Sequence, residues 1–242
     1  MSKPGSSAST AVIVDATTIL SLLAVLAILA ASYALSLHLL PTGTAVKVRL
    51  IYIWHLFDGL IHLLFEGAFL YNCFFVYADG TSPTGFLKQP HRTYGPSYGL
   101  SPTAKLWQEY ARADARWGGA DSTVISIELL TVFLGGPLAL WICEGLRRQN
   151  RNCWLGMVVL ATAELYGGFM TFCPEWLTGS PNLDTSNFMY LWVYLFFFNT
   201  LWVWLPLYVL YEAYGNISLA LASSNTGSGL LVQAASKKQR QA

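Results

Sequence analysis

The feature that most constrains this chain is a set of five apolar windows, each long enough to cross a bilayer as a helix. The hydrocarbon layer is about 30 Å thick and requires about 20 helical residues. An all-α membrane protein with five transmembrane helices is therefore expected, because a helix satisfies its own backbone hydrogen bonds in lipid. The windows run approximately from Ala16 to Leu40, Leu50 to Tyr77, Val124 to Cys143, Cys153 to Phe172, and Phe188 to Tyr211.

The first window has the position of a signal peptide but not its pattern. Its apolar run is longer than the roughly 7 to 15 residues of a signal-peptide core, and no basic cluster or small-residue cleavage site frames it. We interpret residues 16–40 as a retained first transmembrane helix that packs outside the others. The intramembrane pocket is then expected among helices two to five.

The charge balance and the cysteines exclude two classes of function. Lys plus Arg number 14 and Asp plus Glu number 13, so no electrostatic attraction to nucleic acid is expected. The four cysteines show no C-x-x-C pairing and lie in or at the ends of apolar segments. Small apolar packing residues are the simplest interpretation, and neither a disulfide framework nor a zinc site is expected.

The basic residues of the short loops predict the orientation in the membrane. Arg147, Arg148 and Arg151 lie between the third and fourth windows, and further basic residues lie near the C-terminus, whereas residues 173–187 contain no Lys or Arg. The C-terminus is therefore expected on the cytosolic side of a multi-pass protein. The N-terminus and the long loop between the second and third windows are expected on the opposite side.

Three regions outside the windows differ in composition. Residues 1–15 and 218–242 are rich in small and polar residues, so both are predicted to be disordered tails, the second of them basic. The first half of loop 78–122 is dense in Gly, Pro, Ser and Thr and is expected to be irregular. Its second half is predicted to form a short interfacial helix that Gly118 and Gly119 cap, and that serves as a lid or mouth.

Ionisable residues occur at membrane depth in the second window. His55, Asp58, His62 and Glu66 follow one another at spacings of three and four, so they share one helical face. Exposure of this face to lipid costs several kcal/mol, and it is expected to turn toward the bundle interior or a wet cavity. The later windows add further polar residues, which are Glu128, Thr131, Glu164, Asn199 and Trp202.

These residues have a structural explanation and a catalytic one. A single intramembrane Asn or Thr more often links helices than performs chemistry. Buried carboxyl groups such as Glu66 and Glu128 are more demanding, because none of the last four windows contains a Lys or Arg. Acids that converge on His62 without a counter-cation are typical of a site that transfers protons. In an apolar pocket the acceptor is a carbon–carbon double bond, and the Trp202 indole would stabilise the resulting carbocation.

Several of these segments together resemble the emopamil-binding protein family, whose shared region is the EXPERA domain. They are IHLLFEG (61–67), WQEYARADAR (107–116), Glu128-x-x-Thr131 followed by Gly136-Pro137, ELYG (164–167) and FNTLWVWLP (198–206). The resemblance covers roughly residues 47–211, in order and with compatible spacing. It implies a four-helix catalytic region in an endoplasmic-reticulum membrane protein.

The resemblance also implies an activity and a set of site residues. Characterised members move a sterol double bond from the 8,9 to the 7,8 position by protonation, carbocation formation and deprotonation, with no cofactor and no metal. Asp114 and Arg116 are expected to be structural. The catalytic residues that the resemblance implies are His62, Glu66, Glu128, Asn199 and Trp202, and the residues expected to bind substrate are Asp58, Tyr110, Thr131 and Glu164.

Departures from the family pattern leave alternatives open. Asp58 stands where a small or apolar residue is expected, Glu164 replaces a Gln, and Gly168 replaces an Asp of some members. The added acids would suit a terpene or meroterpenoid cyclase, which begins from the same alkene protonation on a prenylated lipid. The sterol isomerase is favoured, the cyclase is the alternative, and a non-enzymatic sterol-binding protein is the third. A homodimer is left open.

Overall fold

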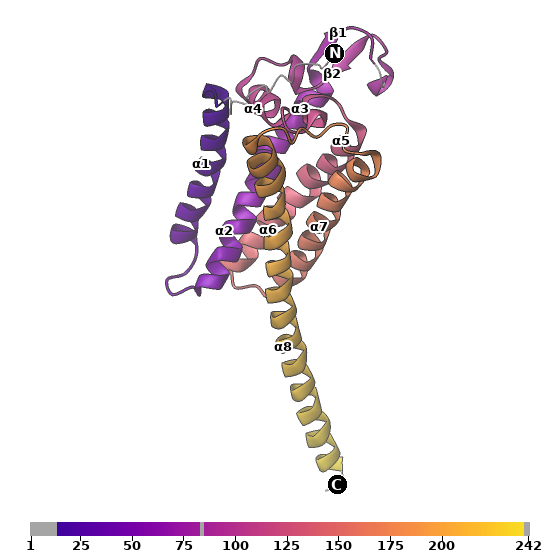
Figure 1. The fold of residues 1–242 in the computed structure, drawn as a ribbon. Helices are drawn as coiled ribbons and strands as arrows, with labels where there is room; N and C mark the ends of the chain where they lie inside the picture. Colours follow the sequence, from indigo (N-terminus) through magenta and orange to yellow (C-terminus); the bar gives the residue numbers. More distant parts are fainter. Residues whose placement is uncertain (1–13, 83–84, 240–242) are drawn as a thin grey trace, which may run out of the picture.

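A computed structural model describes residues 14–82 and 85–239, and its helices confirm the five predicted spans (Figure 1). The spans form a bundle with a small extramembrane region at one end. Two of the five spans are each divided into α-helices by an internal π-helical turn. The helices long and apolar enough to cross a membrane are Ala16–Leu39, Val46–Phe75, Ser122–Arg147, Cys153–Thr178 and Met189–Ser223.

The first span is a single helix, and the second and third are interrupted. The first is α1 (Ala16–Leu39). The second consists of α2 (Val46–Leu60), a π-helical turn (Ile61–Glu66) and α3 (Gly67–Phe75). The third consists of α5 (Ser122–Leu130), a π-helical turn (Thr131–Gly135) and α6 (Gly136–Arg147).

The last two spans complete the bundle. The fourth is α7 (Cys153–Thr178), and the fifth begins with a π-helical segment (Met189–Phe198) that continues as α8 (Asn199–Gln239). Helix α8 projects beyond the bundle at the end opposite the extramembrane region (Figure 1). The sequence predicted a disordered tail from residue 218, whereas the structure continues the helix through Gln239, where Ala, Leu, Gln and Lys favour helix. The rest of the predicted tails, 1–13 and 240–242, lies outside the described residues.

The long loop is more regular than its composition indicated. Strands β1 (Tyr77–Asp79) and β2 (Arg92–Tyr94) pair antiparallel, with Tyr77 opposite Tyr94. A short 3₁₀ turn at Phe86–Lys88 lies between the two strands, and another at Pro96–Tyr98 follows β2. The hairpin was missed because each strand has only three residues, too few for an alternating pattern to emerge.

The predicted interfacial helix is shorter than expected. Helix α4 covers Pro102–Tyr110 and begins at the Ser101 side-chain cap, and a separate 3₁₀ turn covers Ala115–Gly118. Gly118 and Gly119 therefore do not cap this helix. They allow close packing instead, because a Cβ on Gly95, whose φ is +139°, would lie 2.6 Å from the Gly119 Cα atom.

Two of the three hydrophobic clusters among the described residues hold the bundle to its extramembrane end. The larger one joins α2, α6 and α7, with Ile51, Ile142 and Met157 almost fully buried. The other joins α3, α4 and α5 around Phe69 and the stacked rings of Trp107 and Trp117, whose centroids lie 4.7 Å apart. The second span thus contributes α2 to one cluster and α3 to the other.

Helix α1 is exposed over most of its length but is attached to α4 by polar side chains. Its buried Thr18 hydroxyl donates to Glu109 at 2.8 Å, and Arg112 contacts both Glu109 at 3.0 Å and Asp15 at 2.8 Å. The hydrogen bond from Arg112 lowers the pKa of Asp15 to about 2. Because this pKa lies below the ordinary value for Asp, the ion pair between Asp15 and Arg112 is present at neutral pH. It is lost only as the pH falls toward 2.

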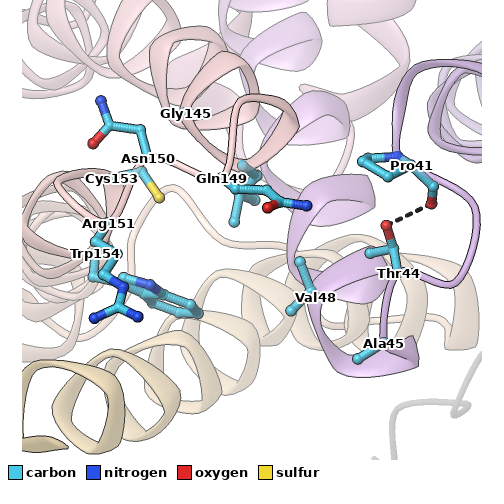
Figure 2. Close-up of a pocket in the computed structure, with 11 residues that line it drawn as sticks. Pro41, Thr44, Ala45, Val48, Gly145, Gln149, Asn150, Arg151, Cys153 and Trp154 are labelled. Atoms are coloured by element: carbon cyan, nitrogen blue, oxygen red, sulfur yellow. Dashed lines mark hydrogen bonds between the residues drawn. The ribbon is translucent and has the colours of Figure 1, made fainter. Parts of the chain in front are cut away.

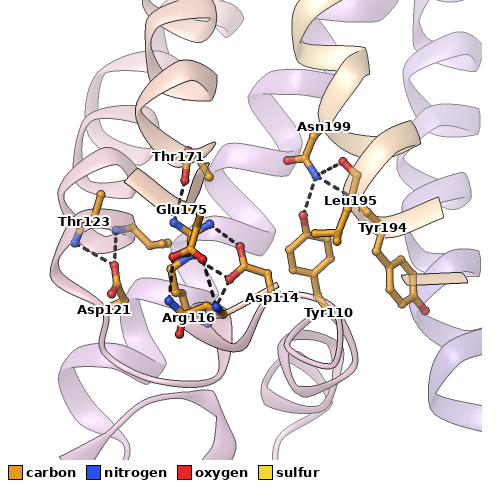
Figure 3. A network of polar contacts seen from close by, with 12 residues as sticks. Tyr110, Asp114, Arg116, Asp121, Thr123, Thr171, Glu175, Tyr194, Leu195 and Asn199 are labelled. Atoms are coloured by element: carbon orange, nitrogen blue, oxygen red, sulfur yellow. Dashed lines mark hydrogen bonds and ion pairs between the residues drawn. The ribbon is translucent and has the colours of Figure 1, made fainter. Parts of the chain in front are cut away.

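A buried ion pair anchors the extramembrane loop to α7 (Figure 3). The Arg116 guanidinium donates to both Asp114 oxygens at 2.9 and 2.6 Å, and to the Thr171 carbonyl oxygen at 2.7 Å. The carboxylate of Glu175 lies 3.7 Å from the same guanidinium. Arg116 supplies all of these hydrogen-bond donors and is buried. This one side chain therefore connects the end of α7 to the extramembrane loop.

Replacing Arg116 by Ala is predicted to destabilise the fold. The change leaves the fully buried Asp114 carboxylate without its cation, which costs about 3–5 kcal/mol of unfolding free energy. The matched control is Arg147→Ala, which removes an exposed pair with Glu144 and is expected to change little. Thermal unfolding in detergent micelles measures both, and equal midpoints for the two variants would contradict the prediction.

Candidate active site

The bundle encloses a large cavity with the predicted acids on its wall. Its volume is about 1440 Å³, above the roughly 300–1,000 Å³ of common small-molecule sites. Three of the predicted acids, Glu66, Glu128 and Glu164, line it, and no Lys or Arg is among the described residues on its wall. Helix α1 also contributes Ser21, Leu22 and Val25, so the pocket is not formed by helices two to five alone.

Two π-helical turns present the polar residues to this cavity. The turn at Ile61–Glu66 contains His62 and Glu66, and the turn at Thr131–Gly135 begins with Thr131. Such turns are rare and are frequent at functional sites. They shift carbonyl groups out of the regular α-helical pattern, and the Trp107 indole N–H donates to one of them, the Phe65 carbonyl oxygen, at 3.0 Å.

His62 lies between two carboxyl groups, one at each ring nitrogen. Its Nδ1 atom is 2.5 Å from Glu66 Oε2, and its Nε2 atom is 3.0 Å from Asp58 Oδ1. The three side chains follow at spacings of four along one helical face, as the sequence predicted, and all are buried. An imidazole flanked in this way can pass a proton between the two carboxyl groups.

A second pair of acids meets across the helix interface. The Thr131 hydroxyl is 2.8 Å from Glu66 Oε2 and 2.9 Å from Glu128 Oε2, so it bridges the two carboxyl groups. A hydroxyl has a single proton, so Thr131 donates to one carboxylate and accepts from the other only if that one is protonated. One proton shared by Glu66 and Glu128 would satisfy both of these contacts.

Trp202 is positioned by Asp58, the acid of α2. Its indole N–H donates to Asp58 Oδ1 at 2.8 Å. Its ring packs edge-on against Trp54, with centroids 5.3 Å apart, and lies 6.1 Å from the Phe57 ring. The indole lines the cavity, so its orientation is fixed by one hydrogen bond and two aromatic neighbours.

Asn199 and Tyr110 form a separate polar contact on the same wall (Figure 3). The Asn199 amide nitrogen donates to the Tyr110 hydroxyl and to the Tyr194 and Leu195 carbonyl oxygens, each at 2.9 Å. Burial raises the pKa of Tyr110, so its hydroxyl keeps its proton at neutral pH. The Asn199 amide nitrogen supports the π-helical segment and does not contact the acids.

Of the nine predicted site residues, seven lie in one polar network and two in this second contact. The seven are Asp58, His62, Glu66, Glu128, Thr131, Glu164 and Trp202. The sequence analysis missed Trp54, which packs against Trp202, and Glu109, which is buried and accepts from the Tyr194 hydroxyl at 2.8 Å. Glu109 lies in the quoted 107–116 segment, so its charge was a usable signal, whereas nothing in the pattern distinguished Trp54.

One group of side chains has the spacing of a cation site. Asp58, His62 and Glu164 offer one ligand atom each, all within 4.8 Å of one another. Carboxylate and imidazole groups are common ligands of divalent cations. The contacts of Asp58 with His62 and with Trp202 also fit proton sharing without a cation.

A second, smaller cavity lies between the α1–α2 and α6–α7 connections (Figure 2). Its volume is about 280 Å³, and its walls include Pro41, Val48 and Trp154. Arg151 is the charged residue on its wall, and no acid or histidine of the described chain lines it. The proton-transfer residues therefore all belong to the large cavity.

Comparison with known proteins places the chain in a family. The sequence profile of EXPERA, the expanded EBP superfamily, matches residues 102–213. Residues 102–213 belong to the EXPERA superfamily. The profile match includes Glu128, Glu164 and Trp202, whereas His62 and Glu66 precede it.

Named relatives of this EXPERA protein fall into two groups. A guinea-pig (Cavia porcellus) 3-beta-hydroxysteroid-Delta(8),Delta(7)-isomerase is 30% identical over 69% of the chain and 63% of its own length. The mouse (Mus musculus) protein of the same name is 28% identical over 74% of the chain and 69% of its own length. A protoglabretal synthase of Citrus sinensis is 25% identical over 66% of each chain. The chain thus spans less than two thirds of the guinea-pig isomerase.

Thr131→Val is predicted to destabilise this EXPERA protein. The substitution keeps the shape but removes the hydroxyl that both Glu66 and Glu128 contact, so each loses a hydrogen-bond partner in a buried site. The expected loss is about 1–3 kcal/mol of unfolding free energy. Thr131→Ser, which keeps the hydroxyl, is the control, and thermal unfolding in detergent compares them. A valine variant as stable as the serine variant would argue against the contact.

Proposed function

We propose that this protein is a membrane isomerase that moves a carbon–carbon double bond in a sterol-like lipid from the 8,9 to the 7,8 position. The observation that supports it is the meeting of acids from two spans, Glu66 and Glu128, on the wall of one apolar cavity. The names of the mammalian relatives support the same reaction. The whole activity requires only proton transfer, which these side chains can perform.

The first step is protonation of the double bond by the Glu66–Glu128 pair. One carboxyl of the pair gives its proton to an alkene carbon, a C–H bond forms, and the π electrons leave the neighbouring carbon as a cation. His62 at 2.5 Å from Glu66 stabilises the carboxylate that results. Two acids that share a titration cannot be told apart as the proton donor, so the pair as a whole is proposed to supply this proton.

The cation is held until a neighbouring carbon loses its proton. The face of an indole attracts a cation by about 0.5–2 kcal/mol, and Trp202 presents its ring at the cavity wall. The negative charge of the carboxyl groups adds to this attraction in a site of low dielectric constant. Loss of the proton from the adjacent C–H bond then forms the new double bond.

The Tyr110–Asn199 contact is proposed to orient the polar end of the lipid. The Tyr110 hydroxyl accepts a hydrogen bond from Asn199 and keeps its own proton, which is free to be donated to a substrate oxygen. The Asn199 carbonyl oxygen accepts no hydrogen bond within the described residues. A hydroxyl at one end of a sterol would therefore find both a donor and an acceptor here.

The location follows from the substrate. A sterol-like lipid is proposed to reach the cavity from the bilayer of the endoplasmic reticulum, with the C-terminus of the protein in the cytosol. One copy of the chain supplies every residue of the proposed site, so a homodimer is not needed for catalysis.

A cyclase that begins with the same protonation is the second candidate. Its support is the presence of Asp58 and Glu164, two further acids in contact with each other beside the cavity. The relative named as a synthase is consistent with a different product from the same fold. In this case another double bond or a hydroxyl of a prenylated lipid would capture the cation.

Glu66→Gln and Glu128→Gln are each predicted to lower turnover by about 10²–10⁴-fold, the usual contribution of a general acid or base. The assay supplies an 8,9-unsaturated sterol to membranes in deuterated water and detects a 7,8 isomer with one deuterium on a carbon of the old double bond. Glu144→Gln, at the exposed end of α6, is the control and is expected to retain activity.

The same assay separates the candidates. An unchanged sterol together with ring formation in a linear prenylated lipid would favour the cyclase. Saturable sterol binding without turnover of either lipid, unaffected by Glu66→Gln, would identify a binding protein and contradict both enzymatic proposals.

Tyr110→Phe is predicted to weaken binding of a 3-hydroxylated sterol more than binding of the same sterol without its hydroxyl. The variant keeps the ring but removes the donor, at a cost of about 0.5–1.5 kcal/mol for one hydrogen bond. Displacement of a fluorescent sterol measures both affinities. Equal losses of affinity for the two sterols would show that Tyr110 does not contact the sterol hydroxyl.

A further inference from the structure

Glu164 and Asp58 form a third acidic contact that the proposed isomerisation does not use. Glu164 on α7 lines the cavity, and Asp58 on α2 lies behind it and is fully buried. The two carboxyl groups are neighbours, because one oxygen of each lies within 4.8 Å of the other and of a His62 ring nitrogen. Asp58 Oδ2 and Glu164 Oε1 are buried and receive no hydrogen bond from an N–H or hydroxyl donor among the described residues.

Two neighbouring carboxyl groups that are both buried are unstable when both are charged. They repel each other and lack hydration, so the stable form shares one proton. No Lys or Arg of the described chain lines the cavity, and the cationic partner within reach is His62, at 3.0 Å from Asp58. The Asp58–Glu164 pair therefore carries one proton and one negative charge, like the Glu66–Glu128 pair.

His62 joins the two pairs into one path for protons. The contacts run from Glu164 to Asp58, from Asp58 to His62 at 3.0 Å, and from His62 to Glu66 at 2.5 Å. The path continues to Glu128 through the carboxyl contact and the Thr131 hydroxyl. Both of its ends, Glu164 and Glu128, face the cavity.

We propose that Glu164 is a second acid–base group of the site, which removes a proton from the carbocation at a carbon that the Glu66–Glu128 pair does not reach. This inference rests on the proposed alkene protonation. The C–H bond next to the cationic carbon breaks, its electrons form the new double bond, and the proton joins the charged Asp58–Glu164 pair. That pair then returns one proton through His62 to the Glu66–Glu128 pair, which restores the starting state.

The arrangement gives Glu164 control over the position of the product double bond. A cation can lose a proton from any neighbouring carbon, and the base that is in place decides which one. Glu164 would touch the reacting atoms and act as a catalytic residue. Asp58 acts through Glu164, His62 and Trp202 and is a positioning residue.

The test compares Glu164→Gln with Glu128→Gln on a sterol that carries deuterium at the carbon that loses its proton. Glu164→Gln is expected to lower turnover by about 10²–10⁴-fold, to raise the substrate isotope effect because proton removal becomes limiting, and to shift the ratio of alkene products. Glu128→Gln is expected to lower turnover without raising this isotope effect. Glu144→Gln is the folding and activity control.

Asp58→Asn tests the positioning role separately. The amide oxygen keeps an acceptor for the Trp202 N–H but cannot hold the shared proton. The variant is expected to raise the same isotope effect. It is also expected to be at least as stable to heat as Asp58→Ala, which removes the acceptor. An unchanged isotope effect and product ratio in both Glu164→Gln and Asp58→Asn would overturn the proposal.

An infrared measurement on the protein without substrate separates this proposal from the function on which it rests. Glu164→Gln is expected to remove a protonated-carboxyl band that Glu144→Gln retains. If the band is unaffected, or if elemental analysis finds one divalent metal per wild-type chain that Glu164→Gln lacks, the shared proton is overturned. If the wild type converts no lipid, the proposed function and the role of Glu164 as acceptor both fail, and the band still decides whether the pair shares a proton.

Discussion

The burial of four carboxyl groups beside His62 in an apolar bundle, with no Lys or Arg among the described residues of the cavity wall, is the constraint on which the structure depends. Each carboxyl group can be neutralised only by a proton, by His62 or by a hydrogen-bond donor. The second, third and fourth spans therefore have to meet closely enough for these groups to touch. Glycines permit this approach: a Cβ on Gly59 would lie 3.1 Å from the Ala139 Cβ, and one on Gly136 would lie 2.9 Å from the Leu63 Cγ.

The π-helical segments are the second determinant of the site. One contains His62 and Glu66, one begins at Thr131, and one ends immediately before Asn199. Each leaves carbonyl groups outside the regular pattern, and side chains from elsewhere compensate for two of the segments. Trp107 donates to the first, and Asn199 donates to the Tyr194 and Leu195 carbonyl oxygens of the third. The extramembrane helix α4, which carries Trp107 and Tyr110, is thereby connected to the geometry of the acids.

Much of this arrangement could be predicted from hydropathy and helical spacing. The five spans follow from the length of the apolar windows, and the common face of Asp58, His62 and Glu66 follows from their spacing of four, which a π turn after Asp58 does not disturb. Contacts between spans are a different matter. The hydrogen bond between Trp202 and Asp58 joins residues 144 positions apart, and no local pattern encodes it.

Two other features escaped prediction for identifiable physical reasons. Helix α1 lines the cavity with Ser21, Leu22 and Val25, yet apolar residues surround it on all sides, so no face was marked as the inner one. The partners of Asn199 were not predicted either, because its amide nitrogen donates to the Tyr110 hydroxyl, 89 positions away, and to the backbone. A polar residue at membrane depth is expected to have a hydrogen-bond partner, but the sequence pattern does not identify that partner.

The π turn at Ile61–Glu66 also determines which side chains of the second span pack into each of the two hydrophobic clusters. Before the turn, Ile51 and Phe57 pack into the cluster with α6 and α7, and after it, Phe69 and Cys73 pack into the cluster with α4 and α5. If the same residues formed an uninterrupted α-helix instead, each extra residue that the π turn accommodates would rotate everything beyond it by about 100° about the helix axis. Phe69 would then turn away from its cluster with α4 and α5. The length of this segment, to the single residue, is what lets one helix serve both the membrane bundle and its extramembrane cover.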